Sequence, residues 1–284
     1  MLRNPLLSCL AVTAMLTLSG CTQPQWRLGV QAYTFRQFTL FETIDKTKAL
    51  NLRYLEGITW QKIGAEAPQA DLLGASDSVL DAVKRKLDQA GVQMPTCYCN
   101  LKGTSEADDR KAFALAKRLG VETLVCEPPA AALERLDRMA EEYGVNLAIH
   151  NHPQGPGRPQ YVNWNPDEVV KMLAGRSRRI GTCPDTGHWT RSGVDPVEAL
   201  KKYQGRVMCV HVKDVVAKTH DARDVVWGTG IGNVRGVLTE LARQKFTGVI
   251  AIEYEDKPED NVNDVAACVR YFTEATRSLR GWGL

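Results

Sequence analysis

Two short apolar runs in this sequence end in side chains that commonly bind metals. Residues 146–152 read Asn-Leu-Ala-Ile-His-Asn-His, and residues 207–214 read Val-Met-Cys-Val-His-Val-Lys-Asp. Alternation along a β-strand places His150 and His152 on one face, while apolar residues such as Ile149 and Val210 face a second layer. Both runs therefore predict strands that are buried on their outer face and carry polar groups inward at their carboxyl ends.

Six similar runs, separated by helical stretches, occupy the rest of the chain. Eight β-then-α units spaced by roughly 30 residues match a single (β/α)8 TIM barrel of the α/β class. A doubly wound sheet is the alternative, but no Gly-x-Gly-x-x-Gly sequence follows the first expected strand. The eight expected strands cover residues 28–35, 53–58, 92–100, 122–127, 146–152, 180–185, 207–214 and 248–255.

The composition excludes several classes of protein. The 284 residues are 44% hydrophobic and 24% charged, which is typical of a globular chain and not of a disordered or multi-span membrane protein. Lys and Arg total 36 against 33 Asp and Glu, and no basic run stands out, so a nucleic-acid partner is not expected. The expected partner is a small molecule, and the sequence does not indicate the oligomeric state.

The N-terminus has the pattern of an export signal. Arg3 precedes an apolar run over residues 6–18, which is too short to cross a bilayer. The run closes on Leu18-Ser19-Gly20-Cys21, which resembles the lipobox of bacterial lipoproteins, and a plain secretory signal is the alternative. We expect residues 1–20 to be a removed signal peptide and residues 21–284 to form the barrel domain. That domain would lie on the periplasmic side, anchored to the membrane only by a lipid on Cys21.

Most of the remaining cysteines fall within expected strands, where a thiol usually serves as a small buried apolar group. Cys97-Tyr98-Cys99 lacks the Cys-x-x-Cys spacing of zinc and redox motifs. The sequence therefore predicts structural thiols at Cys97, Cys99, Cys126, Cys183 and Cys209.

Polar side chains gather where the expected strands end, at the face that carries the active site of a TIM barrel. Glu127 ends the fourth strand, Asp185 the sixth with His188 just beyond, and Glu253 and Glu255 the eighth. Each alone could be a structural hydrogen bond or salt bridge, but their coincidence over several strands favours one divalent cation. Without a cation, ionised groups inside a barrel are costly. Mixed imidazole and carboxylate ligands suit Mn, Co, Fe, Zn or Mg.

Four short motifs of the sequence resemble those of the xylose isomerase-like TIM-barrel superfamily, specifically its sugar phosphate isomerase/epimerase group. They are Leu-Ala-Ile-His-Asn-His at 147–152, Cys-Pro-Asp-Thr-Gly-His at 183–188, His-Val-Lys-Asp at 211–214 and Ile-Glu-Tyr-Glu at 252–255. The resemblance implies one divalent metal held by Glu, Asp, His and Glu from strands five to eight. Asp185, His211 and Glu253 stand at the last three of these positions.

The departure from that group lies on strand five, where His150 stands in place of the expected Glu. His150 can still be the fourth ligand, but a mechanism with two opposed carboxylates is then in doubt. Glu127 is a candidate ligand or base, and Glu253 is a candidate base as well as a ligand. The other candidate proton carriers are His152, His188 and Lys213. Substrate contacts are expected from Glu56, His152, Trp189 and Glu255.

The resemblance implies proton transfer next to a carbonyl through an enediolate. We rank first a metal-dependent sugar isomerase or epimerase, acting on an unphosphorylated sugar or keto-sugar because phosphorylated sugars are made where ATP is. A metal-dependent lyase or hydratase on 3-keto sugars or glycosides ranks close behind, because β-elimination needs only one base. A non-catalytic carbohydrate-binding lipoprotein is a further alternative. The related endonuclease IV enzymes suggest DNA repair, but five histidines are few for their three zinc ions.

Overall fold

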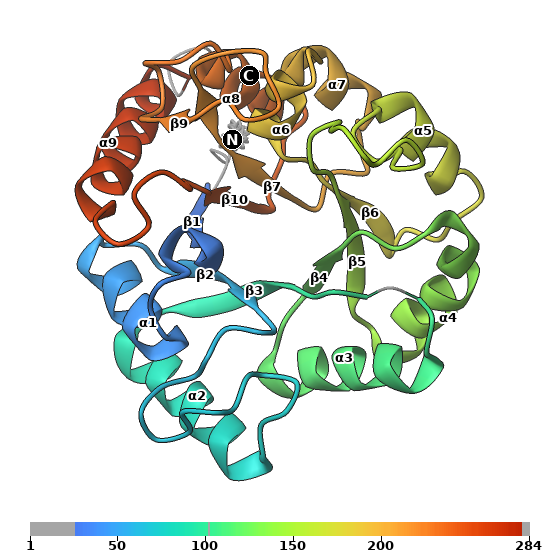
Figure 1. The fold of residues 1–284 in the computed structure, drawn as a ribbon, viewed down its shortest axis with the longest axis vertical. Helices are drawn as coiled ribbons and strands as arrows, with labels where there is room; N and C mark the ends of the chain where they lie inside the picture. Colours follow the sequence, from blue (N-terminus) through green and yellow to red (C-terminus); the bar gives the residue numbers. More distant parts are fainter. Residues whose placement is uncertain (1–25, 102, 280–284) are drawn as a thin grey trace, which may run out of the picture.

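The computed structural model describes residues 26–101 and 103–279, so the expected signal peptide and Cys21 lie outside the described residues. Within these ranges eight parallel strands form a barrel in the order β6-β5-β4-β3-β2-β1-β10-β7, drawn in Figure 1. The bridges Thr182–Val207 and Asp185–His211 close it between β6 and β7. The predicted (β/α)8 barrel is confirmed. Its strands are β1 Arg27–Gln31, β2 Tyr54–Ile58, β3 Gln93–Tyr98, β4 Thr123–Cys126, β5 Asn146–His150, β6 Ile180–Cys183, β7 Cys209–Val212 and β10 Val249–Ile252.

Helices surround the barrel (Figure 1), and several of them begin or end at capping residues. Asn165 and Asp195 each accept a hydrogen bond from the first turn of the helix that they precede. Gly91 and Gly120 end helices in the left-handed conformation. The helices are α1 Leu40–Ala49, α2 Asp77–Ala90, α3 Glu106–Leu119, α4 Leu133–Tyr143, α5 Pro166–Leu173, α6 Thr186–Arg191, α7 Pro196–Lys202, α8 Val234–Arg243 and α9 Val262–Leu279, with 3-10 turns η1 Ala32–Phe35 and η2 Ala130–Ala132 and a small hairpin of β8 Asp214–Val215 and β9 Asp224–Val225.

The alternation of each strand divides the core into two layers. Outward residues such as Ile149 and Val210 join the large cluster between strands and helices. Inward residues such as Ala148 and Cys183 form a second cluster inside the barrel. The predicted structural thiols are confirmed: Cys97, Cys99, Cys126, Cys183 and Cys209 are all buried and not in disulfides. The same is true of Cys268, for which the sequence made no prediction.

The strands are shorter than the sequence indicates. The first expected strand continues to residue 35, whereas β1 ends at Gln31, whose side chain accepts the backbone N–H of Tyr33 and starts η1. Other expected site residues likewise lie just beyond a strand end: His152, Asp185, Lys213, Glu253 and Glu255. There the backbone is free of the sheet ladder, so side chains can turn toward a common centre.

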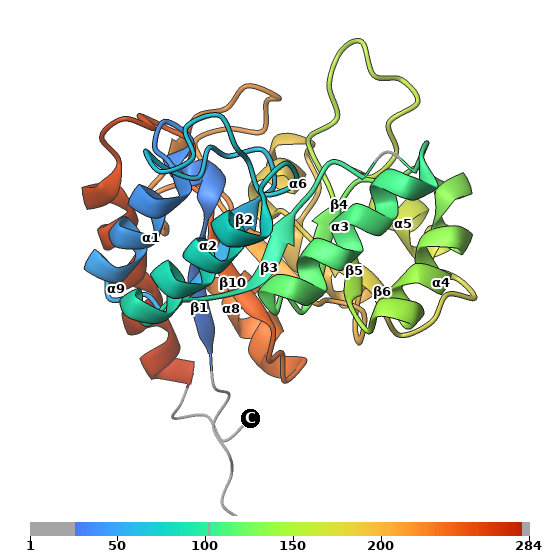
Figure 2. The ribbon, with the colours of Figure 1, turned by 90° about the horizontal axis from the view of Figure 1, so that it is seen from below.

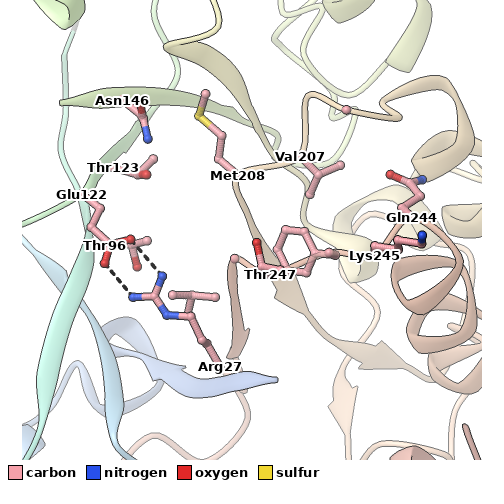
Figure 3. Close-up of a pocket in the computed structure, with 14 residues that line it drawn as sticks. Arg27, Thr96, Glu122, Thr123, Asn146, Val207, Met208, Gln244, Lys245 and Thr247 are labelled. Atoms are coloured by element: carbon pink, nitrogen blue, oxygen red, sulfur yellow. Dashed lines mark hydrogen bonds and ion pairs between the residues drawn. The ribbon is translucent and has the colours of Figure 1, made fainter. Parts of the chain in front are cut away.

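The two ends of the barrel differ in chemistry. The long loop between β5 and α5 rises above the carboxyl ends of the strands in Figure 2. At the opposite end, a cavity of about 340 Å³ contains the ion pair of Arg27 and Glu122, 2.8 Å apart, drawn in Figure 3. Its lining contains no His or Asp of the described chain, so the expected catalytic groups are not there. Among the described helices none has the length and apolarity to span a membrane.

Candidate metal centre

Four side chains from consecutive strand ends converge at the upper end of the barrel. His150, Asp185, His211 and Glu253 each offer one ligand atom, and these atoms lie within 4.8 Å of one another. All four side chains are buried. The expected proximity of Asp185 and His211 follows directly from the bridge between these residues, which closes the barrel at this point. The spacing lets one cation contact all four groups.

The facing atoms of this cluster have no hydrogen-bond partner. Nε2 of His150, Oδ2 of Asp185, Nδ1 of His211 and Oε2 of Glu253 are all buried without one. Nδ1 of His211 lies 2.9 Å from Oε2 of Glu253, but not in hydrogen-bond geometry. The same holds for Lys213 Nζ, which lies 3.0 Å from Asp185 Oδ2. Buried polar atoms are normally satisfied, so four unsatisfied ligand atoms facing one another fit a bound divalent cation.

A carboxylate lies behind each of the two imidazoles. Glu127 Oε1 is 2.9 Å from Nδ1 of His150, and Glu56 Oε1 is 2.7 Å from Nε2 of His211. Such partners fix the orientation of metal-binding histidines and leave the other ring nitrogen free for the metal. Glu56 is fully buried and does not line the cavity above the cluster, so its predicted contact with substrate is wrong.

Glu127 is also hydrogen-bonded to a second histidine. Its Oε1 lies 2.5 Å from Nδ1 of His152, a residue of the loop after β5. Burial acts to raise the pKa of Glu127, but the hydrogen bonds and charges of the two imidazoles outweigh it and lower the pKa to about 2. Glu127 therefore acts mainly as an orienting anion for His150 and His152.

Lys213 places a buried ammonium group beside the cluster. Its side chain is fully buried, and Nζ forms ion pairs with Asp185, Glu253 and Glu255. Burial acts to lower the pKa of Lys213, but these carboxylates outweigh it and hold the pKa well above its usual value. Lys213 thus carries a positive charge beside the cluster.

The Asp-Thr-Gly-His motif at residues 185–188 contacts both the candidate metal cluster and Lys213, which accounts for its residue types. Asp185 Oδ1 accepts the backbone N–H of His188 and caps α6. The Thr186 hydroxyl donates to the carbonyl of Lys213 and accepts its N–H. A Cβ on Gly187 would lie 2.4 Å from Cβ of Lys213, so only glycine fits. The motif therefore positions both a ligand and the neighbouring cation.

Replacing Gly187 by Ala is expected to displace Lys213 and to destabilise the protein by about 1–3 kcal/mol, because both Cβ atoms are fixed to backbone. Urea unfolding monitored by circular dichroism measures the change. Gly74→Ala is the control for substitution itself, since Gly74 has no positive φ and a Cβ there would meet only Oδ1 of the loop residue Asp71, at 3.3 Å. A Gly187 variant as stable as the Gly74 variant would contradict the close approach.

A cavity of about 500 Å³ opens above the cluster. His150, His188, Glu253 and Glu255 line it together with Glu127 and His152, so most of the predicted site residues meet there. Aromatic residues that sequence reasoning did not single out form another part of its wall: Tyr33, Trp60 and Tyr98. Tyr98 could have been found, because it ends β3 at the same face. These rings offer apolar faces for the C–H groups of a ring-shaped substrate.

The predicted substrate contact of Trp189 is wrong. Its side chain is fully buried in the outer core and lies 5.4 Å from the ring of Tyr203, measured between ring centres. Trp189 follows His188 directly in α6, and its side chain points away from the cavity. Helical periodicity, which separates neighbouring side chains by about 100°, explains why only His188 of this pair faces the site.

Divalent metal is expected to raise the melting temperature of the protein, because a ligand that binds only the folded state adds about 2.7 kcal/mol at one hundred times its Kd. EDTA should reverse the shift. Differential scanning fluorimetry with Mn, Co, Zn and Mg measures it. A His211→Ala variant provides the matched comparison, since it removes one ligand of the cluster. Equal shifts for both proteins would place the metal elsewhere.

The fold and this metal-binding cluster define a xylose isomerase-like TIM barrel. A family model of that description matches residues 44–272, which is most of the chain. The protein belongs to this family, and its solved neighbours include a sugar phosphate isomerase/epimerase.

The known relatives include lyases and epimerases. Inosose dehydratase 2 of Bacillus cereus is 28% identical over 153 residues, or 46% of this chain and 48% of the relative. The chain spans about half the length of the curated relatives that it matches. A solved uncharacterised protein from Parabacteroides distasonis ATCC 8503 is 32% identical, with a TM-score of 0.69 over 88% of this chain and 98% of that chain.

Two further solved structures share the fold. A D-tagatose 3-epimerase-like protein is 19% identical, with a TM-score of 0.71 over 90% of this chain and 98% of that chain. The IolI protein, solved with a zinc atom, is 16% identical, with a TM-score of 0.71 over 88% of this chain and 97% of that chain. This fold therefore occurs in a structure that contains a zinc atom.

Proposed function

We propose that this protein is a metal-dependent carbon–oxygen lyase that eliminates a β-substituent from a cyclic keto-sugar or related polyol ketone. The observation that carries the proposal is that the ligand cluster presents a carboxylate to the cavity on one side only. Glu253 belongs to the cluster and lines the cavity, whereas the strand-five ligand opposite it is an imidazole, His150. Epimerisation needs matched proton carriers on both sides of the substrate, and elimination needs one base.

The cluster of His150, Asp185, His211 and Glu253 would hold the cation, which supplies polarisation of the substrate carbonyl. Glu253 then accepts the proton from the carbon next to the carbonyl, and the C–H electron pair forms an enolate. The enolate expels the β-oxygen with its bonding pair, and that oxygen takes a proton from the Lys213 ammonium while His188 donates a hydrogen bond to it. The aromatic wall excludes water from the substrate ring.

Isomerisation or epimerisation, ranked first from the sequence, is the second candidate. It is supported by the fold shared with an epimerase-like protein and by His152, which lines the cavity and could return a proton. In that case His152 and Glu253 would be the two proton carriers.

The two candidates differ in their products. Metal-loaded protein is incubated in deuterium oxide with free ketoses, an inosose and 3-keto glycosides, and the products are followed by NMR. We expect an unsaturated or cleaved product from the inosose or the glycosides. Clean interconversion of the ketoses, with no such product from either other substrate, would replace the lyase by the epimerase.

We also propose that the protein is exported and acylated at Cys21. Support comes from the lipobox at residues 18–21 and from the start of β1 at Arg27, shortly after it. Mass spectrometry of membrane-extracted protein is expected to find a lipidated N-terminal Cys21. An unprocessed chain, or a chain that begins elsewhere without lipid, would contradict this assignment.

A further inference from the structure

His188 lies between two cationic donors. Its Nε2 is 3.1 Å from Nζ of Lys213, and its Nδ1 is 2.9 Å from Nη1 of Arg191. The ring is buried, at the floor of the cavity above the metal cluster. Both sides of the imidazole therefore face a group that can only donate a hydrogen bond.

A neutral imidazole has one acceptor nitrogen and one N–H, so it can accept from only one of these donors. An imidazolium could accept from neither. Arginine keeps its proton in proteins and has no acceptor. The ring can therefore accept from either Arg191 or Lys213, but not from both. The preferred donor is the one that has fewer other hydrogen-bond acceptors.

Arg191 cannot turn away from His188. Its Nε donates to the carbonyl of Ala222 at 2.9 Å, and its Nη2 lies 2.5 Å from Oδ1 of Asp224. The Arg191 side chain is 9% exposed and that of Asp224 is 1% exposed. The other oxygen of Asp224 accepts the backbone N–H of Glu255 at 2.7 Å, so the anion itself is fixed.

Lys213 has other acceptors. Its ammonium forms ion pairs with Asp185, Glu253 and Glu255, and it sits on a flexible four-carbon stem. Losing a hydrogen bond to His188 therefore costs Lys213 little, whereas Nη1 of Arg191 has no other hydrogen-bond acceptor among the residues that the structure describes.

We propose that Arg191, held by Asp224, fixes His188 in the tautomer that carries its proton on Nε2. Arg191 and Asp224 are positioning residues, and His188 presents an N–H donor beside the metal cluster. Under the proposed function, on which this reading of the chemistry rests, His188 donates a hydrogen bond to the departing oxygen and does not remove the substrate proton. This assigns opposite roles to His188 and Glu253.

The tautomer is measurable without any substrate. The mature protein is labelled with 15N, loaded with zinc, and its imidazole nitrogens are observed by long-range 1H–15N correlation. His188→Gln identifies the resonances of His188. We expect an unprotonated Nδ1 and a protonated Nε2 in the wild type, a loss of this preference in Arg191→Met, and its retention in Arg191→Lys, which keeps a donor.

Arg223→Met is the matched control, because Arg223 adjoins Asp224 in sequence but its side chain is 59% exposed. It should leave the His188 resonances unchanged. Arg191→Met leaves the buried Asp224 unpaired, so the double variant Arg191→Met/Asp224→Asn provides a folded alternative with neither charge. The double variant should also lose the preference.

A protonated Nδ1 in the wild type, or an unchanged His188 pattern in the folded Arg191 variants, would overturn the proposal. The activity assay reports on a different question. If the tautomer is as expected but no sugar reacts, the lyase assignment fails and the positioning role stands.

Discussion

Replacing Asp185 by Asn is expected to lower kcat/KM by at least about 10³-fold and to abolish specific metal binding. The loss corresponds to several kcal/mol of Lewis-acid stabilisation, at about 1.36 kcal/mol for each tenfold change. Asn retains an acceptor for the His188 N–H at the start of α6. Its amide group, however, replaces the unpartnered Oδ2 that faces the cluster and Lys213. Metal analysis of the dialysed protein and steady-state kinetics measure both effects.

Asp195→Asn is the matched control, because Asp195 also caps a helix, α7, but lies outside the metal-binding cluster. It should retain metal and activity. An Asp185 variant that keeps stoichiometric metal with the wild-type affinity would show that the four-residue cluster is not the metal centre.

Replacing Lys213 by Met is expected to destabilise the metal-free protein by about 3–5 kcal/mol. The substitution keeps most of the side-chain volume but leaves three carboxylates without their common cation. Removing one partner of a buried ion pair leaves an uncompensated charge, which is the costly case. Added metal should recover part of the loss, since it neutralises Asp185 and Glu253. Urea unfolding in EDTA and in excess metal measures both terms.

Lys202→Met is the surface comparison. Lys202 pairs with Asp167 at 2.7 Å, and the two side chains are 44% and 61% exposed. Solvent screens such a pair, so a loss below about 1 kcal/mol is expected. Similar losses for Lys202 and Lys213 would mean that the buried carboxylates near Lys213 do not depend on its charge.

Local patterns in the sequence predicted the fold and the gathering of polar side chains at one end of the barrel, and the family resemblance implied which of them would be metal ligands. The alternation around Ile149 and Val210 marked the faces that pack on helices, and His150, Asp185, His211 and Glu253 stood at strand ends. These predictions depended on two facts: a strand turns alternate residues to opposite faces, and parallel strands bring their carboxyl ends to one edge.

The errors concerned residues whose environment depends on distant parts of the chain. Glu56 was expected to contact substrate, but its position deep in the barrel turns it to His211, which is 155 residues away. Trp189 was expected at the site, but the rotation of α6 directs it into the outer core against Tyr203. Neither contact leaves a local pattern in the sequence.

By itself the sequence determined the barrel and the inward placement of the candidate ligands. Only the tertiary structure decided which ligand atoms remain unpartnered, which carboxylates support Lys213 and the two metal-facing imidazoles, and which donor His188 must accept from. The physical reason is that strand periodicity is set by neighbouring residues. A buried charge or hydrogen bond is instead set by whatever group the fold brings within about 3 Å, from any distance along the chain.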